Sequence, residues 1–368
     1  MKSLLRTPAA SLFVLVLPFS FYPKLIDGDT QPWPLLASLL LFGLSRRAKQ
    51  MSRLDLLMVA VTIASFIVYF PRSGFNQDLA RFAYKLIAFN LLWFCVPSLP
   101  PVLVSRAMRW VIAIWFIVGL LQTLAMMLGI DVSYSGRFVP GRSGVPSLAP
   151  EPSLYGTLSI VALLYLIASK DGVRPAYIFM AFANVFLSGS ILSILVSALV
   201  VLFFGYRTKL VLVTLALGLG FFILSSDLLF LSRVNNIIDS GLKLELLLLD
   251  YSINLRVGHI IYTLWEVLPS ALIFQTSAEF GNEYNLWVAK NQLFYPTGSD
   301  FILTGMGNII YRGGIFGLLV LVLVFVTAYR LTPERRVFKL MVLGGLMLAQ
   351  LDLSSPFIIL YALQRKER

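Results

Sequence analysis

The sequence predicts an all-α, polytopic integral membrane protein with about 11–12 transmembrane helices, and three observations support this prediction. Hydrophobic residues make up 58% of the 368-residue chain and charged residues only 13%, which is about half the charged fraction of a typical soluble domain. The mean hydropathy is +0.84. Several apolar runs also reach the roughly 17–25 residues that a helix needs to cross the hydrocarbon core.

The predicted helices are apolar segments separated by polar or Gly- and Pro-rich residues. The first begins after Lys2 and Arg6, as a signal peptide would, but no small-residue cleavage site follows, so we expect a retained helix. The last two are short enough to form one helix. In chain order the segments are 8–22, 33–44, 55–71, 83–97, 110–130, 153–169, 175–187, 190–205, 210–230, 303–329, 338–351 and 355–363.

The short connections between these segments predict how the chain crosses the membrane. Lys and Arg gather in alternate connections, and because basic residues are held on the cytoplasmic side, we expect these connections and both termini to be cytoplasmic. The net charge of +12 then reflects topology and not binding to nucleic acid. The basic connections are 46–53, 105–109, 170–174, 206–209, 330–339 and the tail 365–368.

This orientation places both long polar loops, 131–152 and 231–302, on the extracytoplasmic side. The cytoplasmic face keeps only brief links, which leave no room for a nucleotide-binding domain. No internal repeat is visible, which argues against a transporter built from inverted halves, so we expect a single transmembrane domain over residues 1–368. With one Cys and one His, an internal disulfide is excluded and a His/Cys metal site is not expected.

The first long loop carries a candidate site for a phosphate-bearing ligand. Arg137 and Arg142 offer planar guanidinium forks that match phosphate oxygens. Glu151 precedes Pro152, which suits the first position of the following helix. A carboxylate at that helix N-terminus can act as a general base or orient an acceptor hydroxyl. The alternative is an ordinary loop at headgroup level whose arginines contact lipid phosphates.

The second long loop contains an amphipathic segment that predicts a helix over about 252–268. A histidine one turn from an arginine on the same face suits proton transfer beside leaving-group stabilisation. Two alternatives stay open, because a helix lying on the membrane surface gives the same stripe and a lone histidine is often structural. At about 3.6 residues per turn, the polar face contains Ser252, Arg256, His259, Thr263 and Glu266.

Three lesser features add candidates. Asp27 and Asp29 have the spacing of a metal site, which also arises by chance. Arg81 and Lys85, four residues apart at the outer start of a helix, extend a basic path toward a lipid pyrophosphate or reach to lipid headgroups. Arg312 precedes a Gly-rich run and is a further phosphate candidate. No Walker loop, Ser-His-Asp set or dinucleotide fingerprint occurs in a supporting context.

Several of these motifs together resemble a known family. The run Arg142-Ser143-Gly144 followed by APEPSLYG (149–156) resembles the R-x-G … E-P-S signature of bacterial O-antigen and exopolysaccharide polymerases, the Wzy-type proteins related to O-antigen ligases. Downstream, LSGSILS (187–193) and TGMGNIIYRGGIFGLL (304–319) resemble the family's short helix pair and its Gly-rich start of a late helix. The resemblance covers the layout of most of the chain and implies an architecture similar to that of GT-C glycosyltransferases.

The resemblance implies a reaction at the periplasmic side of the bacterial inner membrane. A glycan linked to undecaprenyl pyrophosphate is transferred to a sugar hydroxyl of another lipid-linked repeat unit, with inversion at the sugar carbon. Because the leaving group is already a pyrophosphate, arginines can stabilise its charge and neither metal nor cofactor is needed. The implied partners are this lipid-linked oligosaccharide, membrane lipids and a protein that regulates chain length.

The resemblance also implies roles for individual residues. Arg142 and Arg256 clamp the pyrophosphate with help from Arg137, while Glu151 or His259 takes the proton of the attacking hydroxyl. Ligase-like relatives usually place a histidine shortly before the late Gly-rich helix, and this chain has none there. That difference favours a polymerase over an O-antigen ligase and leaves the base unassigned. The competing functions are a transporter or flippase of lipid-linked oligosaccharide and a scaffold in an export complex.

Overall fold

The computed structural model describes residues 53–73, 77–95, 101–130, 144–149, 152–168, 174–190, 251–270, 280–298 and 302–331, with a few isolated positions elsewhere. Within these ranges the regular structure is all helical and there is no β-strand. Three helices are long and apolar enough to cross a membrane, over Arg53–Pro71, Val104–Met127 and Gly305–Thr327. The described chain therefore has the character of a helical membrane protein, whereas the number of spans and the two large loops stay predictions.

The described helices begin and end close to predicted apolar segments. Three of them start at a proline, which has no N–H to leave unsatisfied in the first turn. The helix α7 ends where Gly189 adopts the left-handed conformation and donates its N–H to the Phe186 carbonyl. The bounds are α3 Arg53–Ser73, α4 Gln77–Cys95, α5 Pro101–Met127, α6 Pro152–Ala168, α7 Pro175–Ser188, α12 Tyr251–Tyr262, the π-helix η2 Thr263–Val267, α13 Leu268–Ser270, α14 Phe280–Asn291 and α15 Gly305–Leu331.

One predicted connection is wrong. Its two arginines predict that residues 105–109 form a cytoplasmic link, but these residues lie inside α5, which already begins at Pro101. Arg106 is exposed and Arg109 is half-buried. Long basic side chains at a helix end can lay their stems along apolar surface and keep the charge in a polar layer, so the helix continues through them.

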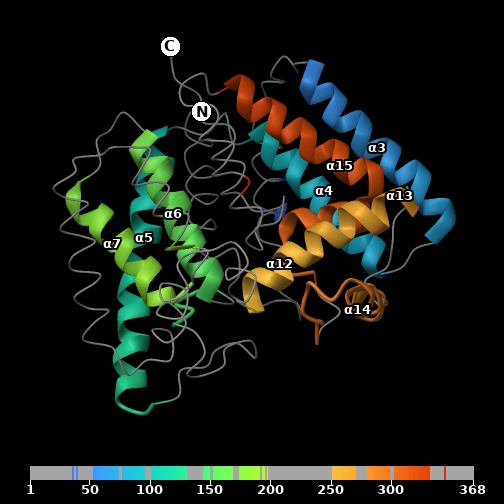
Figure 1. Cartoon of the computed structure of the whole chain (residues 1–368). Coiled ribbons are helices and arrows are strands. Elements are labelled where there is room, and N and C mark those ends of the chain that lie inside the picture. The colour runs from blue at the N-terminus through green and yellow to red at the C-terminus, as the bar shows by residue number, and fades with distance from the viewer. Residues whose placement is uncertain are drawn as a thin grey trace, which may run out of the picture.

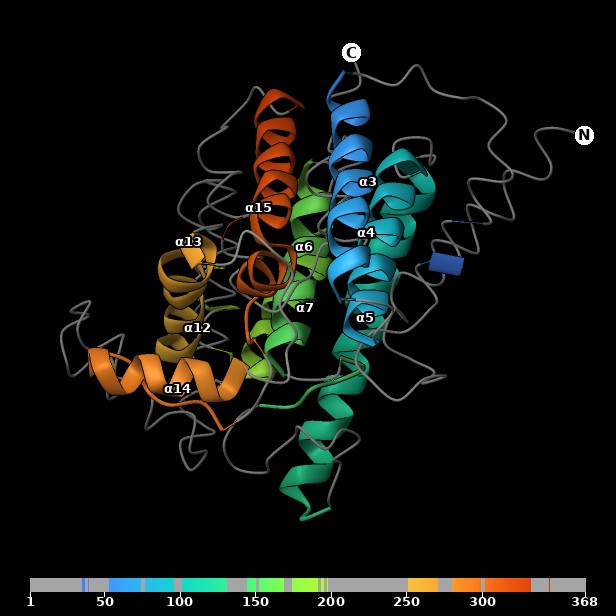
Figure 2. The same ribbon diagram turned by 90° about the vertical axis from the view of Figure 1, so that its right-hand side faces the viewer.

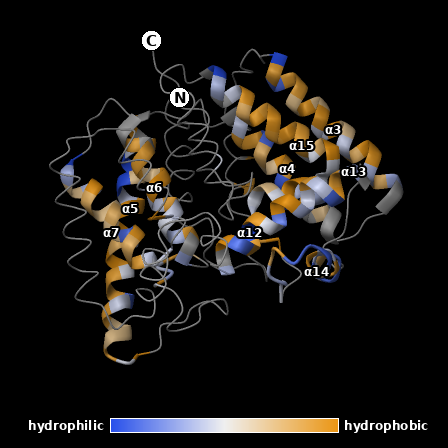
Figure 3. Cartoon of the chain, viewed as in Figure 1, coloured by the Kyte–Doolittle hydropathy of each residue, from blue (hydrophilic) through white to orange (hydrophobic). Residues whose placement is uncertain are grey.

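Figure 1 shows the described helices in two groups. In one, α5, α6 and α7 pack together; in the other, α15 packs on α3, α3 packs on α4, and η2 and α13 pack on α15. The N-terminal end of α3 and the C-terminal end of α15 lie together, and α14 lies crosswise near the opposite end (Figure 2). Apolar residues cover α3 and α15, and polar residues gather around α14 (Figure 3). The second group is therefore an apolar bundle with a more polar unit at one end.

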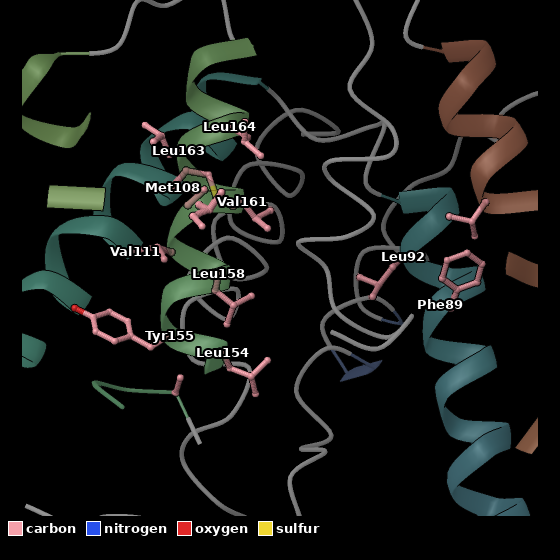
Figure 4. Packing of buried hydrophobic residues seen from close by; sticks show 14 of the residues in the cluster. Phe89, Leu92, Met108, Val111, Leu154, Tyr155, Leu158, Val161, Leu163 and Leu164 are labelled. Carbon is pink, nitrogen blue, oxygen red and sulfur yellow. The ribbon is translucent and has the colours of Figure 1, made fainter. Parts of the chain in front are cut away.

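Buried apolar side chains pack between the helices of the first group. Leu158 and Val161 of α6 lie beside Met108 and Val111 of α5 (Figure 4), and all four are at most 1% exposed. The phenylalanine and leucine side chains of α4 drawn in the same view, at positions 89 and 92, belong to the same buried cluster. Close packing of this kind drives association of helices in a membrane, where the surrounding lipid is as apolar as the side chains.

A buried asparagine joins the three helices of the first group. Asn184 of α7 donates from Nδ2 to the Ile112 carbonyl at 3.2 Å and to Ser159 Oγ at 3.1 Å. Its Oδ1 accepts the Tyr155 hydroxyl at 2.7 Å, and the same hydroxyl lies 3.0 Å from the Trp115 carbonyl oxygen. Because a buried amide without partners is costly, this network specifies how α5, α6 and α7 meet.

The helix α15 is broken near its start. Gly314 has φ 49° and ψ −136°, values that end regular helix and that a residue with a Cβ rarely adopts. The Tyr69 hydroxyl of α3 donates a hydrogen bond to the Gly313 carbonyl at this break. The Tyr69 ring also packs edge-on against Phe316, with ring centroids 5.8 Å apart. The break therefore separates a short first portion of α15, which ends in Arg312, from the apolar portion that follows.

The hydroxyl of Tyr69 should contribute measurably to stability. In the Tyr69→Phe variant the Gly313 carbonyl loses its donor at a buried break, which costs about 1–3 kcal/mol. The unfolding free energy of the detergent-solubilised protein measures this loss. Tyr251→Phe is the matched control because Tyr251 is 49% exposed, and it should change stability by less than about 0.5 kcal/mol. Equal effects of the two variants would contradict the assigned role.

Candidate functional site

A short irregular segment, residues 144–149, lies inside the first group of helices. The Gln122 side chain brackets Ser147, donating to its carbonyl at 3.0 Å and accepting its N–H at 2.7 Å. The Ser147 hydroxyl donates to the Trp115 carbonyl at 2.9 Å, near the middle of the apolar stretch Val104–Met127. Non-helical backbone at such depth is tolerated only where protein satisfies its polar groups. The segment that follows Arg142 in sequence is thus built into the bundle.

Two of the sequence motifs pack on each other here. Val145 donates its N–H to the Leu187 carbonyl at 2.9 Å. A Cβ added to Gly156 would lie 2.5 Å from Ser188 Oγ and 2.7 Å from Ser193 Oγ, so the backbone of α6 passes directly over the serines of LSGSILS. The hydroxyl of Thr157, next in the chain, lies 3.1 Å from Ser193 Oγ. The described parts of the two motifs therefore form one contact surface.

Several predicted site residues cannot be placed. Arg137, Arg142 and Glu151 lie outside the described residues, as do Asp27 and Asp29. The backbone of Arg81 belongs to α4, but its side chain lies outside the described part. Convergence of Arg142 and Arg256 on one ligand therefore stays a prediction. Within the described ranges, no group of three or more His, Cys, Asp or Glu side chains is gathered as a metal site.

The only histidine of the chain is fully buried on α12. His259 is 0% exposed, and its Nδ1 accepts the Leu303 N–H at 3.0 Å. Its ring meets those of Phe280 and Tyr284 edge-on, with centroids 4.9 and 4.6 Å apart. Since Nδ1 is the acceptor, the neutral ring carries its proton on Nε2, a buried atom with no hydrogen-bond partner among the described residues. His259 thus ties α12 to the start of α15.

The surroundings of His259 keep it neutral. Burial, and secondly the positive charge of Arg256, lower its pKa to about 3. An imidazole with this pKa is a weak base at neutral pH, and its one lone pair already accepts the Leu303 N–H. These contacts favour the structural alternative. A catalytic role for His259, which requires this hydrogen bond to open, stays a prediction.

The helix from Tyr251 to Ser270 buries part of its predicted polar face. His259 and Thr263 are 0% exposed, whereas Trp265 is 79% exposed and Leu264 is 37% exposed. Two residues of the predicted polar stripe therefore pack against protein, while Arg256 is half-buried and Glu266 is exposed.

Arg256 and Arg312 belong to elements that pack into one unit. Arg256 is half-buried one turn before His259, and Arg312, at the end of the short first portion of α15, is 9% exposed. The Nε atoms of both are buried. The bond from Leu303 to His259 fixes the helix of Arg256 against the start of α15. The structure thus brings α12 and α15, the helices of these two predicted phosphate-binding residues, into contact.

Glu283 is a polar residue of this unit that sequence reasoning missed. Its Oε2 accepts hydrogen bonds from the hydroxyls of Tyr262 and Tyr311, both at 3.3 Å, so one carboxylate links α12, α14 and α15. The spacing of Phe280, Tyr284 and Trp287 was the available signal, because it predicts a helix with one buried aromatic face. These three residues with Tyr262 and Tyr311 belong to a buried group that we call the aromatic cluster.

No protein-family model, curated protein or solved structure matches the chain.

The structural role of His259 predicts a difference between two variants. His259→Asn keeps an acceptor for the Leu303 N–H and should retain activity. His259→Leu leaves that buried N–H unsatisfied, so its free energy of unfolding should fall by about 1–3 kcal/mol. Because the pKa of His259 falls from 6.5 to about 3 on folding, the unfolded state binds more protons between these values. The contribution of His259 to the free energy of unfolding is therefore complete above pH 6.5 and is lost as the pH falls toward 3.

Unfolding temperatures of wild type and His259→Asn, measured at several pH values, test this sign. The stability of the wild type should fall more steeply with acid than that of the variant. Identical slopes would contradict the assigned neutral state of the buried ring.

The close approach of residue 144 to α7 predicts a second effect. A Cβ at Gly144 would overlap the Leu187 carbonyl and lie 2.5 Å from the Ser188 carbonyl carbon, both of which are backbone atoms. Gly144→Ala should therefore cost about 1–3 kcal/mol through overpacking. Gly298→Ala is the control, because no atom lies within 4 Å of the added Cβ. Thermal stability and the yield of monodisperse protein measure both, and equal values would refute the packing argument.

Proposed function

We propose that this protein is a glycosyltransferase of the bacterial inner membrane that polymerises oligosaccharides linked to undecaprenyl pyrophosphate at the periplasmic side. A hydroxyl of one lipid-linked repeat unit attacks the anomeric carbon of another. The bond from that carbon to the pyrophosphate oxygen breaks, and lipid pyrophosphate leaves with the electron pair. The proposal rests on the family resemblance and on the way the described residues are arranged.

The observation that carries the proposal is that Arg256 and Arg312 are partly buried and lie on elements that pack together. Both arginines have buried Nε atoms, and the bond between His259 and Leu303 ties the helix of Arg256 to the residues just before α15. Guanidinium forks suit a pyrophosphate because they bind its oxygens in pairs and keep their charge at any physiological pH. Donors held rigidly in a low-dielectric site stabilise a developing negative charge without reorganisation.

The packing of the R-S-G … E-P-S-L-Y-G region on LSGSILS supports the same proposal. In the resemblance, this region supplies Arg142 and Glu151, and its described neighbours Gly144 and Pro152 belong to the tightly built segments of the first group. A loop that only touches lipid headgroups needs no buried anchor such as the Gln122 bracket on Ser147. The anchoring therefore favours a functional loop over an ordinary one.

The direct test is a reaction of the purified protein with a lipid-pyrophosphate oligosaccharide, in which a ladder of products is expected. Transfer of a single unit to a lipid A core acceptor would instead identify a ligase. Movement of labelled substrate across vesicles without any ladder would identify a flippase.

Arg256→Lys should lower kcat/KM of this reaction by about 100-fold, because an ammonium group cannot reproduce a paired guanidinium contact. Arg330→Lys is the matched control, since Arg330 is exposed at the far end of α15, and it should stay within about twofold of wild type. Activity of Arg256→Lys near that of the control would remove Arg256 from the pyrophosphate site. The reaction should also proceed in the presence of a metal chelator.

A further inference from the structure

We propose that Glu283 of α14 accepts the proton of the attacking sugar hydroxyl, an inference that rests on the polymerase reaction proposed above. The residue lies on the helix that runs crosswise at one end of the second group, beside α12 and α15 (Figure 2). It is half-buried, so part of the carboxylate side chain reaches the surface of the unit.

The carboxylate of Glu283 is oriented by two neighbours. Tyr262 is 4% exposed and Tyr311 1% exposed, and both hydroxyls donate to the same atom, Oε2. Burial, and secondly the carboxylate of Glu283, raise the pKa of Tyr262, so its phenol stays protonated and remains a donor. Within the described residues Oε1 accepts no hydrogen bond. One oxygen is thus fixed, and the other is left to accept a proton.

The position of Glu283 relates it to the arginines. Tyr311 immediately precedes Arg312 in α15, and Tyr262 follows Arg256 by less than two turns of the same helix. The two hydrogen bonds therefore attach the carboxylate to both elements that carry the pyrophosphate-binding candidates. A proton acceptor and a leaving-group clamp must flank one reacting carbon, and these two bonds keep the carboxylate beside the elements that carry both arginines.

The other candidates of this unit are less suited to the role. The lone pair of His259 is engaged by the Leu303 N–H, and its ring is 0% exposed. Glu266 of η2 is exposed, whereas Glu283 is half-buried and accepts from two buried tyrosines. Glu151 lies outside the described residues and enters the experiment as a competing variant.

The acceptor hydroxyl oxygen forms a bond to the anomeric carbon while the bond from that carbon to the pyrophosphate oxygen breaks. The leaving oxygen keeps the bonding electron pair, and the hydroxyl proton moves to Oε1 of Glu283. The products are the extended glycan, lipid pyrophosphate and a protonated carboxyl group, which returns its proton to water before the next cycle.

Glu283→Gln is the informative variant, because the amide oxygen can still accept from Tyr262 and Tyr311 while the group can no longer take a proton. In the ladder assay, kcat should fall by about 100-fold or more with KM within about twofold of wild type. The unfolding temperature should stay unchanged. Glu266→Gln is the matched control and should keep wild-type kcat.

The outcomes separate this inference from the proposed function. If wild type forms no ladder, the polymerase proposal fails and the inference with it. If wild type forms a ladder and Glu283→Gln does too at a similar kcat, only the role of Glu283 is overturned. A rise in KM without a fall in kcat would likewise overturn it, because it would show a positioning residue. Loss of activity in Glu151→Gln alone would assign the base to the first loop instead.

Discussion

Buried backbone groups that leave a helix have no water to bond within an apolar bundle, so protein side chains must satisfy them. Examples among the described residues are satisfied by side chains distant in sequence: Gln122 brackets Ser147, Tyr69 bonds Gly313, and His259 accepts from Leu303. Each bond therefore also fixes a tertiary contact. The candidate motifs border these same places, because irregular backbone is where side chains can be presented toward a ligand.

The apolar runs predict the described helices well where no charge intervenes. The run 55–71 lies within α3, Arg53–Ser73, and the run 303–329 nearly coincides with α15, Gly305–Leu331. The start of α5 could not be predicted in this way, because arginines near a helix end resemble a loop in sequence although their stems pack as part of the helix. The break at Gly314 is also invisible to hydropathy, since it lies inside the single predicted apolar run 303–329.

The candidate site was predictable in its residue types but not in its environment. The sequence places Arg256 and His259 one turn apart, yet the side of the helix that packs on protein depends on whether lipid or water covers the other side. Here His259 and Thr263 pack on protein, whereas Trp265 and Glu266 are exposed. Glu283 was missed because its significance comes from two tyrosines on other helices, which lie 21 and 28 residues away in the chain.

The aromatic cluster also influences how strongly the charge of Arg256 acts on neighbouring groups. Phe280 and Tyr284 surround His259 with rings of low polarity, where charges interact more strongly than in water. The low pKa of His259 reflects this environment, since burial and then the charge of Arg256 both disfavour an imidazolium. The same positive charge, acting through the same medium, favours a negative group. Arg256 therefore favours a negative group at this position, and a neutral His259 preserves that field where a charged one would repel the arginine.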